Sequence, residues 1–292
     1  MSLTPWQTFV SVCRLRSLSA AATEAGYTQS AVSRQVGALE RIAGVRLLER
    51  QARGVTPTDA GEAFLRHALV VVNEAERAIR AAQAARAGFP RPLAVGATPS
   101  LAAGAVPAAM RRLLDESGPL AWSLVPGLTP EIHNKVVSGE LDIAVVTDAP
   151  PGLPDDDRVV REALGTDQMV VIVRRADEAA GRREVRIEEL SQQTWAEDNE
   201  GSANLLRQHA ARAGVTARID MCAADLPGKV AMVAAGHAIA LVPGSLIPAL
   251  RPDVVAVQLV GAPTRGIFAV LPRHQQHPAA LTLVPLLRSA VG

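Results

Sequence analysis

Apolar residues recur at the spacing of α-helices through most of the first ninety residues. A first helix is expected to begin at Thr4-Pro5, because threonine caps a helix and proline is tolerated in its first turn. A second, short helix is expected over residues 20–25, with Ser19 as its cap and a tight turn at Gly26 behind it. The buried face of the first helix is predicted from its helical spacing to consist of Trp6, Phe9, Val10 and Cys13.

A third helix is predicted from a cap at Thr28 to about residue 43. Its apolar stripe of Val32, Val36 and Leu39 faces the core. The opposite face carries short polar groups and one arginine, namely Ser30, Ser33, Arg34 and Gly37. A helix that reads the DNA major groove requires such a face, because bulky side chains would keep the backbone away from the bases. The pattern therefore predicts a helix-turn-helix, although the solvated face of a small helical bundle would look similar.

Several side chains in and behind this helix have the chemistry for DNA contacts. Arg34 can form a bidentate contact with guanine, and Gln29 can do the same with adenine. Residues 44–61 contain two short extended stretches joined by a basic tip, which predicts a wing that places Arg50 and Arg53 beside phosphates or in the minor groove. We expect DNA contacts from Gln29, Ser30, Ser33, Arg34, Arg50 and Arg53.

In this region the chain closely resembles the LysR-type transcriptional regulators. The matching positions are Ser19, the run from Thr28 to Val36, Leu39, Glu40, Gly44, Leu47, Arg50, Thr56, Thr58, Ala60 and Gly61. Two positions depart from the family pattern, because Gly37 stands where a basic side chain is common and Leu48 replaces a phenylalanine. The first departure weakens DNA contacts, and the second exchanges one core residue for another.

A helix of about thirty residues is expected after Thr58, since Asp59 and Glu62 favour its start and the next break is Gly88. Its apolar residues alternate in steps of four and three, which predicts a seam that pairs with another helix. The seam consists of Phe64, Ala68, Val71, Ala75, Ala78, Ala82 and Ala85. Packing against its own domain would give a similar stripe, but the LysR resemblance implies dimerisation through this helix.

Behind a break at residues 89–92, short apolar strands alternate with helical stretches, which is typical of a parallel sheet covered on both faces. The first strands are expected at 93–97, 120–125 and 141–146, with helices at 101–116 and 130–138. The resemblance implies an α/β effector domain with the two-lobed fold of periplasmic solute-binding proteins. A second lobe would hold strands at 169–173, 194–197, 218–222 and 238–242, and the chain would return at 267–271 to a last helix at 281–291.

The predicted domains are a winged helix-turn-helix at 1–60, a linker or dimerisation helix at 58–88 and an effector domain at 91–292. Within the effector domain, lobe I covers 91–165 and 266–292, and lobe II covers 166–265. The resemblance implies a dimer or tetramer on an interrupted inverted repeat of double-stranded DNA. A regulator whose rear lobes only oligomerise, without a ligand, is an open alternative.

Ligands bind beyond the carboxyl ends of the strands in such sheets. The predicted effector-binding residues are Thr98, Pro99, Ser100, Thr129, Asp198, Asn199, Ser202 and Leu226. For each of the four hydroxyl side chains taken singly, helix capping is the favoured role. Asp198 and Glu200 would repel a purely anionic effector, so we predict a ligand with amine or hydroxyl donors.

Composition supports this division of the chain. The 292 residues exceed one usual core, and residues 1–90 hold 11 Arg against 7 acidic residues while the rest holds 19 Lys and Arg against 22, which gives +4 and −3. This asymmetry favours a front part that meets a polyanion. The start lacks an export signal and the apolar runs are too short to cross a bilayer, so we expect a cytoplasmic protein without a membrane partner.

The sequence predicts no enzyme, cofactor or metal site. Nucleophile-elbow, Walker, dinucleotide-binding and zinc-protease motifs do not occur in the sequence. His274 and His277 are predicted to lie in an exposed turn without further ligands. Cys13 and Cys222 fit no metal pattern and are both expected to be buried thiols.

Overall fold

The computed structural model describes residues 2–51, 54–86 and 91–291. The chain divides into two compact units. The amino-terminal unit contains residues 1–91 together with 137–140, and the carboxy-terminal unit contains 92–136 and 141–292.

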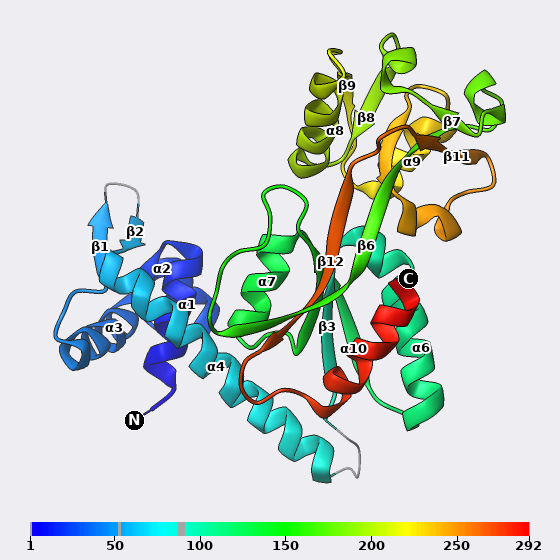
Figure 1. Ribbon diagram of the computed structural model, residues 1–292. Helices are drawn as coiled ribbons and strands as arrows, with labels where there is room; N and C mark the ends of the chain where they lie inside the picture. The colour runs from blue at the N-terminus through cyan, green and yellow to red at the C-terminus, as the bar shows by residue number, and fades with distance from the viewer. Residues whose placement is uncertain (1, 52–53, 87–90, 292) are drawn as a thin grey trace. The chain divides into compact units, whose positions relative to one another are not determined.

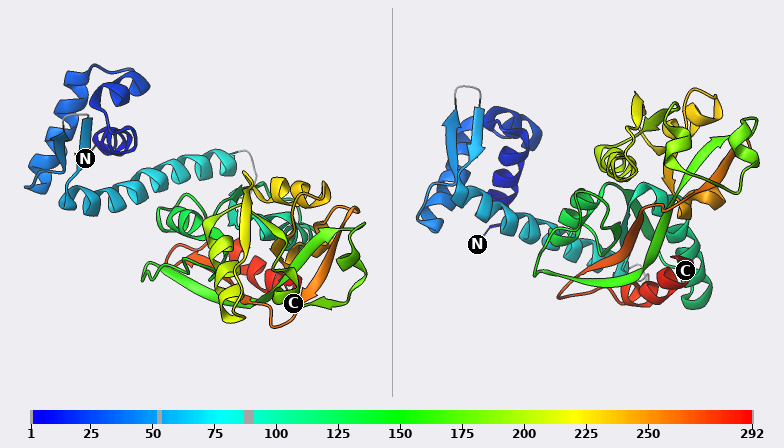
Figure 2. Two further views of the ribbon diagram at one scale, coloured as in Figure 1. Left: turned by 90° about the horizontal axis from the view of Figure 1, so that it is seen from above. Right: turned by 45° about the horizontal axis from the view of Figure 1, so that its top comes forward.

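The amino-terminal unit is a small helical domain with a β-hairpin and one long helix (Figures 1 and 2). Thr28 caps the third helix as predicted, accepting a hydrogen bond from the backbone N of Ala31 at 3.2 Å. The cap predicted at Ser19 is wrong, because Ser17 has the extended backbone of a cap and accepts from Ala20 N at 3.2 Å. The elements are α1 (Thr4–Leu15), α2 (Leu18–Ala25), α3 (Gln29–Ala43), β1 (Leu48–Gln51), β2 (Gly54–Pro57) and α4 (Asp59–Arg86).

Polar contacts join α3, the hairpin and α4. Oε1 of Glu40 accepts hydrogen bonds from the backbone N of Leu47 at 2.9 Å and of Leu48 at 3.2 Å. The Thr58 hydroxyl donates to the carbonyl of Arg46 at 2.8 Å and accepts from Gly61 N at 3.0 Å, so it caps α4. Gly61 lies so close to the Leu47 carbonyl oxygen that a Cβ would overlap it. These residues fix the geometry of the domain.

The first part of α4 packs inside its own unit. The Phe64 ring stacks on Trp6 with centroids 4.8 Å apart and meets Phe9 edge-on at 5.3 Å, and Ala68 is fully buried in the same core. Both predicted seam residues thus contact the core of their own unit, where Ala68 is fully and Phe64 partly buried. Further along, Ala75 is half-buried, Val71 and Ala78 are exposed, and the side chain of Ala85 lies outside those described.

The first lobe of the carboxy-terminal unit is built on the strand order β4-β3-β5-β12-β6. Strands β4, β3 and β5 are parallel, whereas β12 and β6 run antiparallel to their neighbours, so the expectation of a parallel sheet is only partly correct. Helices α6 and α10 cover the core formed by β3, β5 and β12. Its elements are β3 (Leu93–Ala97), α5 (Pro99–Ala103), α6 (Ala105–Ser117), β4 (Trp122–Pro126), α7 (Thr129–Val137), β5 (Ile143–Thr147), β12 (Thr264–Pro272) and α10 (Pro278–Val291).

The second lobe continues from the long strand β6 (Val159–Arg174), which pairs there with β10 and β11. Met169, Val171 and Val173 face one apolar cluster, and Val170 and Ile172 face another, so this stretch is buried on both sides. The remaining elements are η1 (Glu178–Gly181), β7 (Glu184–Val185), η2 (Ile187–Leu190), β8 (Thr194–Glu197), α8 (Glu200–Arg212), β9 (Arg218–Cys222), α9 (Leu226–Ala234), β10 (Ala240–Pro243), η3 (Gly244–Ala249) and β11 (Val254–Leu259).

Strands β6 and β12 run side by side through lobe I as far as its junction with lobe II (Figure 1). The strand predicted at 169–173 is therefore only the second half of β6. Its first half escaped prediction because Arg161, Glu162 and Gly165 interrupt the apolar pattern. β12 is also longer than the predicted 267–271.

Two single-residue predictions are wrong. His277 is only 5 % exposed, and its Nδ1 accepts a hydrogen bond from Ala279 N at 3.1 Å at the start of α10. The helix consequently begins at Pro278, earlier than expected. Cys222 is exposed at the end of β9, whereas Cys13 is partly buried and this burial raises the pKa of its thiol to about 12.

Candidate DNA-binding and effector-binding sites

The polar face of α3 is exposed, as a surface that meets DNA must be. Gln29, Ser30, Ser33 and Arg34 are all exposed on this helix. The Arg34 guanidinium donates to the Ser30 carbonyl at 3.4 Å, a weak bond that leaves the rest of its donors free for other partners. A Cβ at Gly37 would meet nothing within 4 Å, so the face has open space there.

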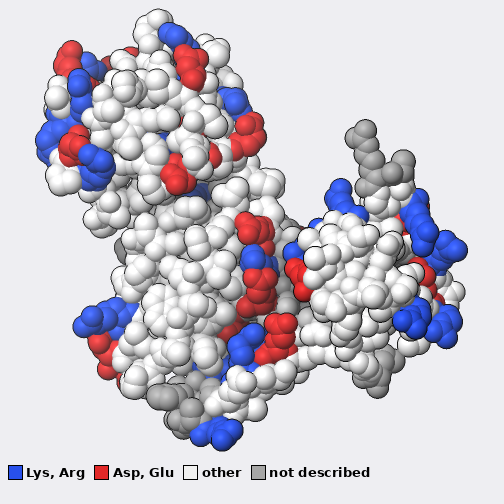
Figure 3. Space-filling view, turned by 180° about the vertical axis from the view of Figure 1, so that it is seen from behind, with Lys and Arg blue, Asp and Glu red and all other residues white. Residues whose placement is uncertain are grey.

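Basic groups flank this helix. Arg50 is exposed on β1, and Arg53 lies outside the described residues. In the space-filling view, basic side chains gather on the visible flank of the amino-terminal unit (Figure 3). The arrangement presents short polar groups on a helix together with cations that can pair with phosphates.

A cavity of about 450 Å³ lies between the two lobes of the carboxy-terminal unit. The structure brings all eight predicted effector residues to its wall, namely Thr98, Pro99, Ser100, Thr129, Asp198, Asn199, Ser202 and Leu226. The lobes also touch beside the cavity, because a Cβ at Gly201 would overlap the carbonyl oxygen of Pro150. Sequence reasoning missed three charged residues of the wall, namely Glu131, Lys229 and Arg265.

None of the four hydroxyl side chains has the capping role that was favoured for it. Thr129 donates to the Thr147 carbonyl at 3.0 Å, and Ser100 accepts from the Arg265 guanidinium at 2.8 Å. Ser202 bonds to Lys229 at 3.0 Å, while Asn199 caps α8. Thr98 occupies the cap position of α5 without a side-chain bond, and its buried hydroxyl has no partner among the described residues.

Lys229 forms a buried ionic cluster on the side of lobe II. Its ammonium group lies 2.5 Å from Glu197 Oε2 and 3.1 Å from Asp198 Oδ1, and only 1 % of its side chain is exposed. Burial raises the pKa of Glu197, although Lys229 acts in the opposite direction. Because the Ser202 hydroxyl takes the third bond, the ammonium has no donor left for a ligand.

Arg265 forms a second buried cluster where β12 and β6 pass between the lobes. Its guanidinium meets Asp167 Oδ2 at 2.8 Å, and this carboxylate also accepts from the backbone N and hydroxyl of Ser245 at 3.0 and 2.7 Å. Both members of the ion pair are at least nine-tenths buried. The cluster holds residues of β6, β12, α5 and η3 together.

A second cavity of about 730 Å³ adjoins the first and is mainly apolar. The two cavities share wall residues, including Leu128, Glu131, Asp198 and Leu226. Most of the remaining wall comes from small or aliphatic side chains of α5, α9 and η3, such as Ala102, Ala103, Val230, Leu246 and Leu250. The walls of both cavities are mainly apolar, and the first also carries the charged groups of Lys229 and Arg265.

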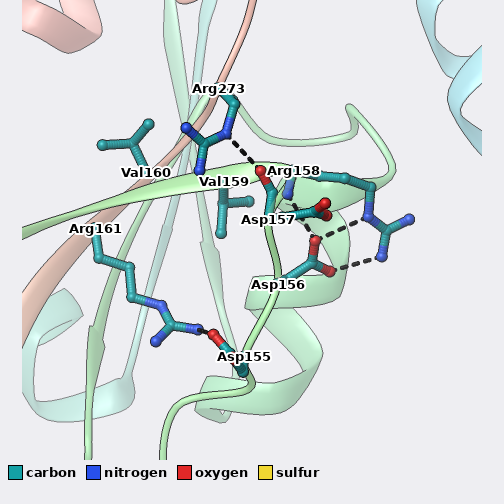
Figure 4. A pocket seen from close by; sticks show the side chains of 8 residues that line it. All are labelled: Asp155, Asp156, Asp157, Arg158, Val159, Val160, Arg161 and Arg273. Atoms are coloured by element: carbon teal, nitrogen blue, oxygen red, sulfur yellow. Dashed lines mark hydrogen bonds and ion pairs between the residues drawn. The ribbon is translucent and has the colours of Figure 1, made fainter.

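A separate depression of about 770 Å³ lies on the surface at the start of β6 (Figure 4). Asp156 pairs with Arg158 at 2.6 Å, Asp155 lies 3.6 Å from Arg161, and Arg273 donates to the Asp157 carbonyl at 2.5 Å. Since two of its three arginines already pair with carboxylates, the depression is a weaker candidate for a ligand than the space between the lobes.

Among the described residues, no group of three metal-ligating side chains occurs, and no helix is long and apolar enough to cross a bilayer.

Two family models match the chain. Residues 3–62 match the bacterial regulatory helix-turn-helix protein, lysR family, and residues 86–292 match the LysR substrate binding domain. The chain belongs to the LysR family. Its two matched regions correspond to the helical unit with the hairpin and to the two-lobed unit described above.

Curated relatives are LysR-type regulators of moderate similarity. PcaQ of Agrobacterium fabrum is 36% identical over 141 residues, which are 48% of this chain and 45% of PcaQ, so the match spans about half of that relative. DgdR of Burkholderia cepacia is 28% identical and matches 83% of this chain and 78% of its own length. BudR of Raoultella terrigena is 27% identical over 90% of this chain and 91% of its own.

Solved structures share the whole fold. The LysR family transcriptional regulator CbnR has a TM-score of 0.71 at 22% identity, with both chains covered completely. A full-length variant of OxyR from Pseudomonas aeruginosa has a TM-score of 0.68 at 21% identity, covering 99% of this chain and 95% of the other. At this identity the likeness supports the two-lobed fold with its helix-turn-helix, and not a particular ligand.

Proposed function

We propose that this LysR-family chain is a transcription regulator that binds promoter DNA and responds to a small molecule held between its lobes. The observation that carries the proposal is the convergence of eight separately predicted loop residues on one cavity, in a chain whose other unit exposes a DNA-reading face. A structure of full-length CbnR with its target DNA supports DNA binding by this architecture.

Each candidate DNA contact has a distinct role in the proposal. Gln29 and Arg34 read base edges, Ser30 and Ser33 allow close approach, and Arg50 and Arg53 pair with phosphates or enter the minor groove. The regulator acts in the cytoplasm as a dimer or tetramer on an interrupted inverted repeat, because one recognition helix supplies few base contacts. Val71, Ala75 and Ala78 of α4 supply the self-association face.

The effector would act by changing the arrangement of the lobes. Thr98, Ser100 and Thr129 lie on lobe I, and Asp198, Asn199 and Ser202 lie on lobe II, so a bound molecule would contact both. Such a ligand shifts the DNA-binding equilibrium only if it binds one arrangement more tightly than the other. An experiment must therefore measure how ligand binding changes the affinity of the protein for DNA.

DNA reading is tested with two arginine variants and footprinting at the promoter beside the gene. Arg34→Ala should weaken binding to the specific site by about tenfold or more while leaving nonspecific binding nearly unchanged, since a good bidentate base contact contributes about 1–3 kcal/mol. Arg50→Ala, the comparison variant, should weaken binding to all sequences and reduce the salt slope by about one unit. An unchanged footprint and affinity for Arg34→Ala would refute the assigned reading face.

Sensing is tested by screening a library of amines, alcohols and carboxylates for thermal stabilisation of the full-length protein. A compound that stabilises the protein should also change its affinity for promoter DNA. If no compound does both, the rear lobes serve assembly alone and the sensing half of the proposal is wrong. Product formation from a compound would indicate an enzyme.

A further inference from the structure

The Arg265 guanidinium, nine-tenths buried between the lobes, has one nitrogen without a partner. Its Nε and Nη2 donate to Asp167 Oδ2 at 3.2 and 2.8 Å, and Nη2 also donates to Ser100 Oγ at 2.8 Å. Nη1 has no hydrogen bond among the described residues, and protein atoms do not enclose it completely. Since Arg265 lines the cavity of about 450 Å³, the two N–H groups of Nη1 are available to a molecule bound there.

The ion pair of Arg265 holds the guanidinium in a fixed orientation. The Asp167 carboxylate cannot turn away, because it also accepts hydrogen bonds from the backbone N and the hydroxyl of Ser245 at 3.0 and 2.7 Å. A donor that is already held in place loses little conformational entropy when a ligand binds to it. Nη1 is therefore a preorganised donor in the wall of the cavity.

The Asn199 side chain is a second, independent donor in the same wall. Its Oδ1 accepts a hydrogen bond from Ser202 N at 2.9 Å and caps α8, which fixes the amide orientation and assigns the other end as Nδ2. This Nδ2 has no hydrogen bond within the described part of the chain. Asn199 lines both cavities from lobe II, so unpartnered donors reach the space from the β6–β12 strand pair and from lobe II.

The cavity has no excess of positive charge that would hold an anion. Both cations of its wall, Lys229 and Arg265, already pair with carboxylates. The acidic wall residues Glu131, Asp198 and Glu200 outnumber these cations. A carboxylate ligand would therefore enter surroundings of net negative charge.

The free part of Arg265 also suits a single acceptor oxygen better than a carboxylate. Carboxylates bind arginine most strongly through two adjacent nitrogens, and here Nη2 is already used by Asp167 and Ser100. A cationic ligand gains no better support, because Asp198 pairs with Lys229 at 3.1 Å and Glu200 pairs with Arg207 at 2.7 Å.

We propose that the molecule sensed between the lobes is uncharged and carries a carbonyl oxygen, as ketones, esters and amides do, which accepts hydrogen bonds from Arg265 Nη1. The inference rests on the proposed sensing function and names the chemical class of the effector. Asn199 Nδ2 donates to the same oxygen or to a second acceptor on the ligand. The rest of the molecule is apolar, since the walls of both cavities are mainly apolar.

Calorimetric titration of the full-length protein with probes of nearly the same shape tests the class of ligand. Acetophenone and benzamide carry a neutral carbonyl group, whereas benzoate is an anion and 1-phenylethylamine is a cation. The two carbonyl compounds should bind at least tenfold more tightly than the two charged compounds. α-Methylstyrene, in which a methylene group replaces the carbonyl oxygen of acetophenone, should also bind at least tenfold more weakly, because it leaves the donors unpaired.

Two variants test the assigned donors. Arg265→Lys keeps a positive charge beside Asp167 but removes Nη1, and it should weaken acetophenone binding at least tenfold, since hydrogen bonds from charged groups are the stronger ones. Asn199→Ser keeps a capping side chain but removes Nδ2, and it should weaken binding about threefold to tenfold. The matched controls Arg111→Lys on α6 and Asn204→Ser on α8 lie outside both cavity walls and should leave binding unchanged.

The inference is overturned if benzoate or 1-phenylethylamine binds more tightly than the carbonyl compounds, or if neither carbonyl compound binds at millimolar concentration. Equal acetophenone binding by Arg265→Lys and the unaltered protein also overturns it. If that variant does not fold, equal binding by Asn199→Ser decides in the same way. The sensing function itself still stands if any compound of the library screen stabilises the protein and alters its affinity for promoter DNA. It fails if neither these probes nor any library compound does so.

Discussion

Two helical glycines lie in opposite surroundings. A Cβ at Gly37 of α3 would meet nothing, whereas one at Gly61 of α4 would overlap the Leu47 carbonyl oxygen. We expect Gly37→Ala to raise the free energy of unfolding of the amino-terminal unit by about 1 kcal/mol, since alanine restricts the unfolded chain and favours helix. Gly61→Ala should lower it by about 1–3 kcal/mol through overpacking.

Urea denaturation followed by circular dichroism measures both glycine variants against the unaltered protein. Opposite signs are the expected result. Equal effects would mean that helix propensity alone decides these positions. Gly61 is one of the positions that match the LysR family, whereas Gly37 departs from the family pattern. Opposite effects of the two variants would therefore agree with the family pattern at both positions.

The chemistry of single side chains was the least predictable part of the candidate site. Thr98, Ser100, Thr129 and Ser202 were placed correctly, because the ends of strands in an α/β sheet converge. Their partners depend on residues distant in sequence, such as the carbonyl of Thr147 or the guanidinium of Arg265. A lone lysine in an apolar helix was the available signal for the Lys229 cluster, since a buried lysine needs carboxylate partners.

At the scale of elements, α4 serves two purposes along its length. Its first turns are part of the domain core through Phe64 and Ala68, and the exposed side of its later turns carries Val71, Ala78 and Ile79. We expect Val71→Glu to weaken dimerisation by at least tenfold, because pairing would bury an unpaired carboxylate against apolar side chains. Sedimentation velocity at several protein concentrations measures the change.

His67→Glu is the matched control for α4, because it introduces the same side chain at an exposed position outside the predicted seam. It should leave the dimer unaffected. If Val71→Glu remains as dimeric as His67→Glu, this face of α4 does not mediate self-association.

Capped and strongly periodic elements were predicted well, and paired strands were not. Helix α3 follows directly from the cap at Thr28 and the stripe of Val32, Val36 and Leu39. Strand β6 was found only in part, because its first half lies among charged residues and gains its structure from pairing with β12. Such pairing joins residues about a hundred positions apart, and no local pattern encodes it.

At the scale of the whole molecule, buried histidines connect stability to pH. His133 of α7 is only 1 % exposed, its ring nitrogens have no partner among the described residues, and burial lowers its pKa below the ordinary 6.5. In the unfolded chain the His133 imidazole takes up a proton near pH 6.5. In the folded chain burial disfavours the charged form, so protonation needs a lower pH. The free energy of unfolding should therefore fall as the pH drops below 6.5, by up to about 1.4 kcal/mol per pH unit for this one group.

His133→Leu should reduce the steepness of this fall, and His274→Gln, an exposed change, should not. Urea denaturation between pH 7.5 and 5 measures the slope for both variants. An unchanged slope for His133→Leu would show that other groups, such as His209 with its similarly lowered pKa, govern the acid sensitivity.

The continuous strand pair of β6 and β12 has a mechanical consequence. Two antiparallel strands that share their hydrogen bonds across the passage between the lobes can twist without breaking a bond, while sliding along each other would break the whole ladder. The Arg265–Asp167 ion pair bridges the same two strands. We therefore expect the lobes to turn relative to each other about this strand pair rather than to slide along it.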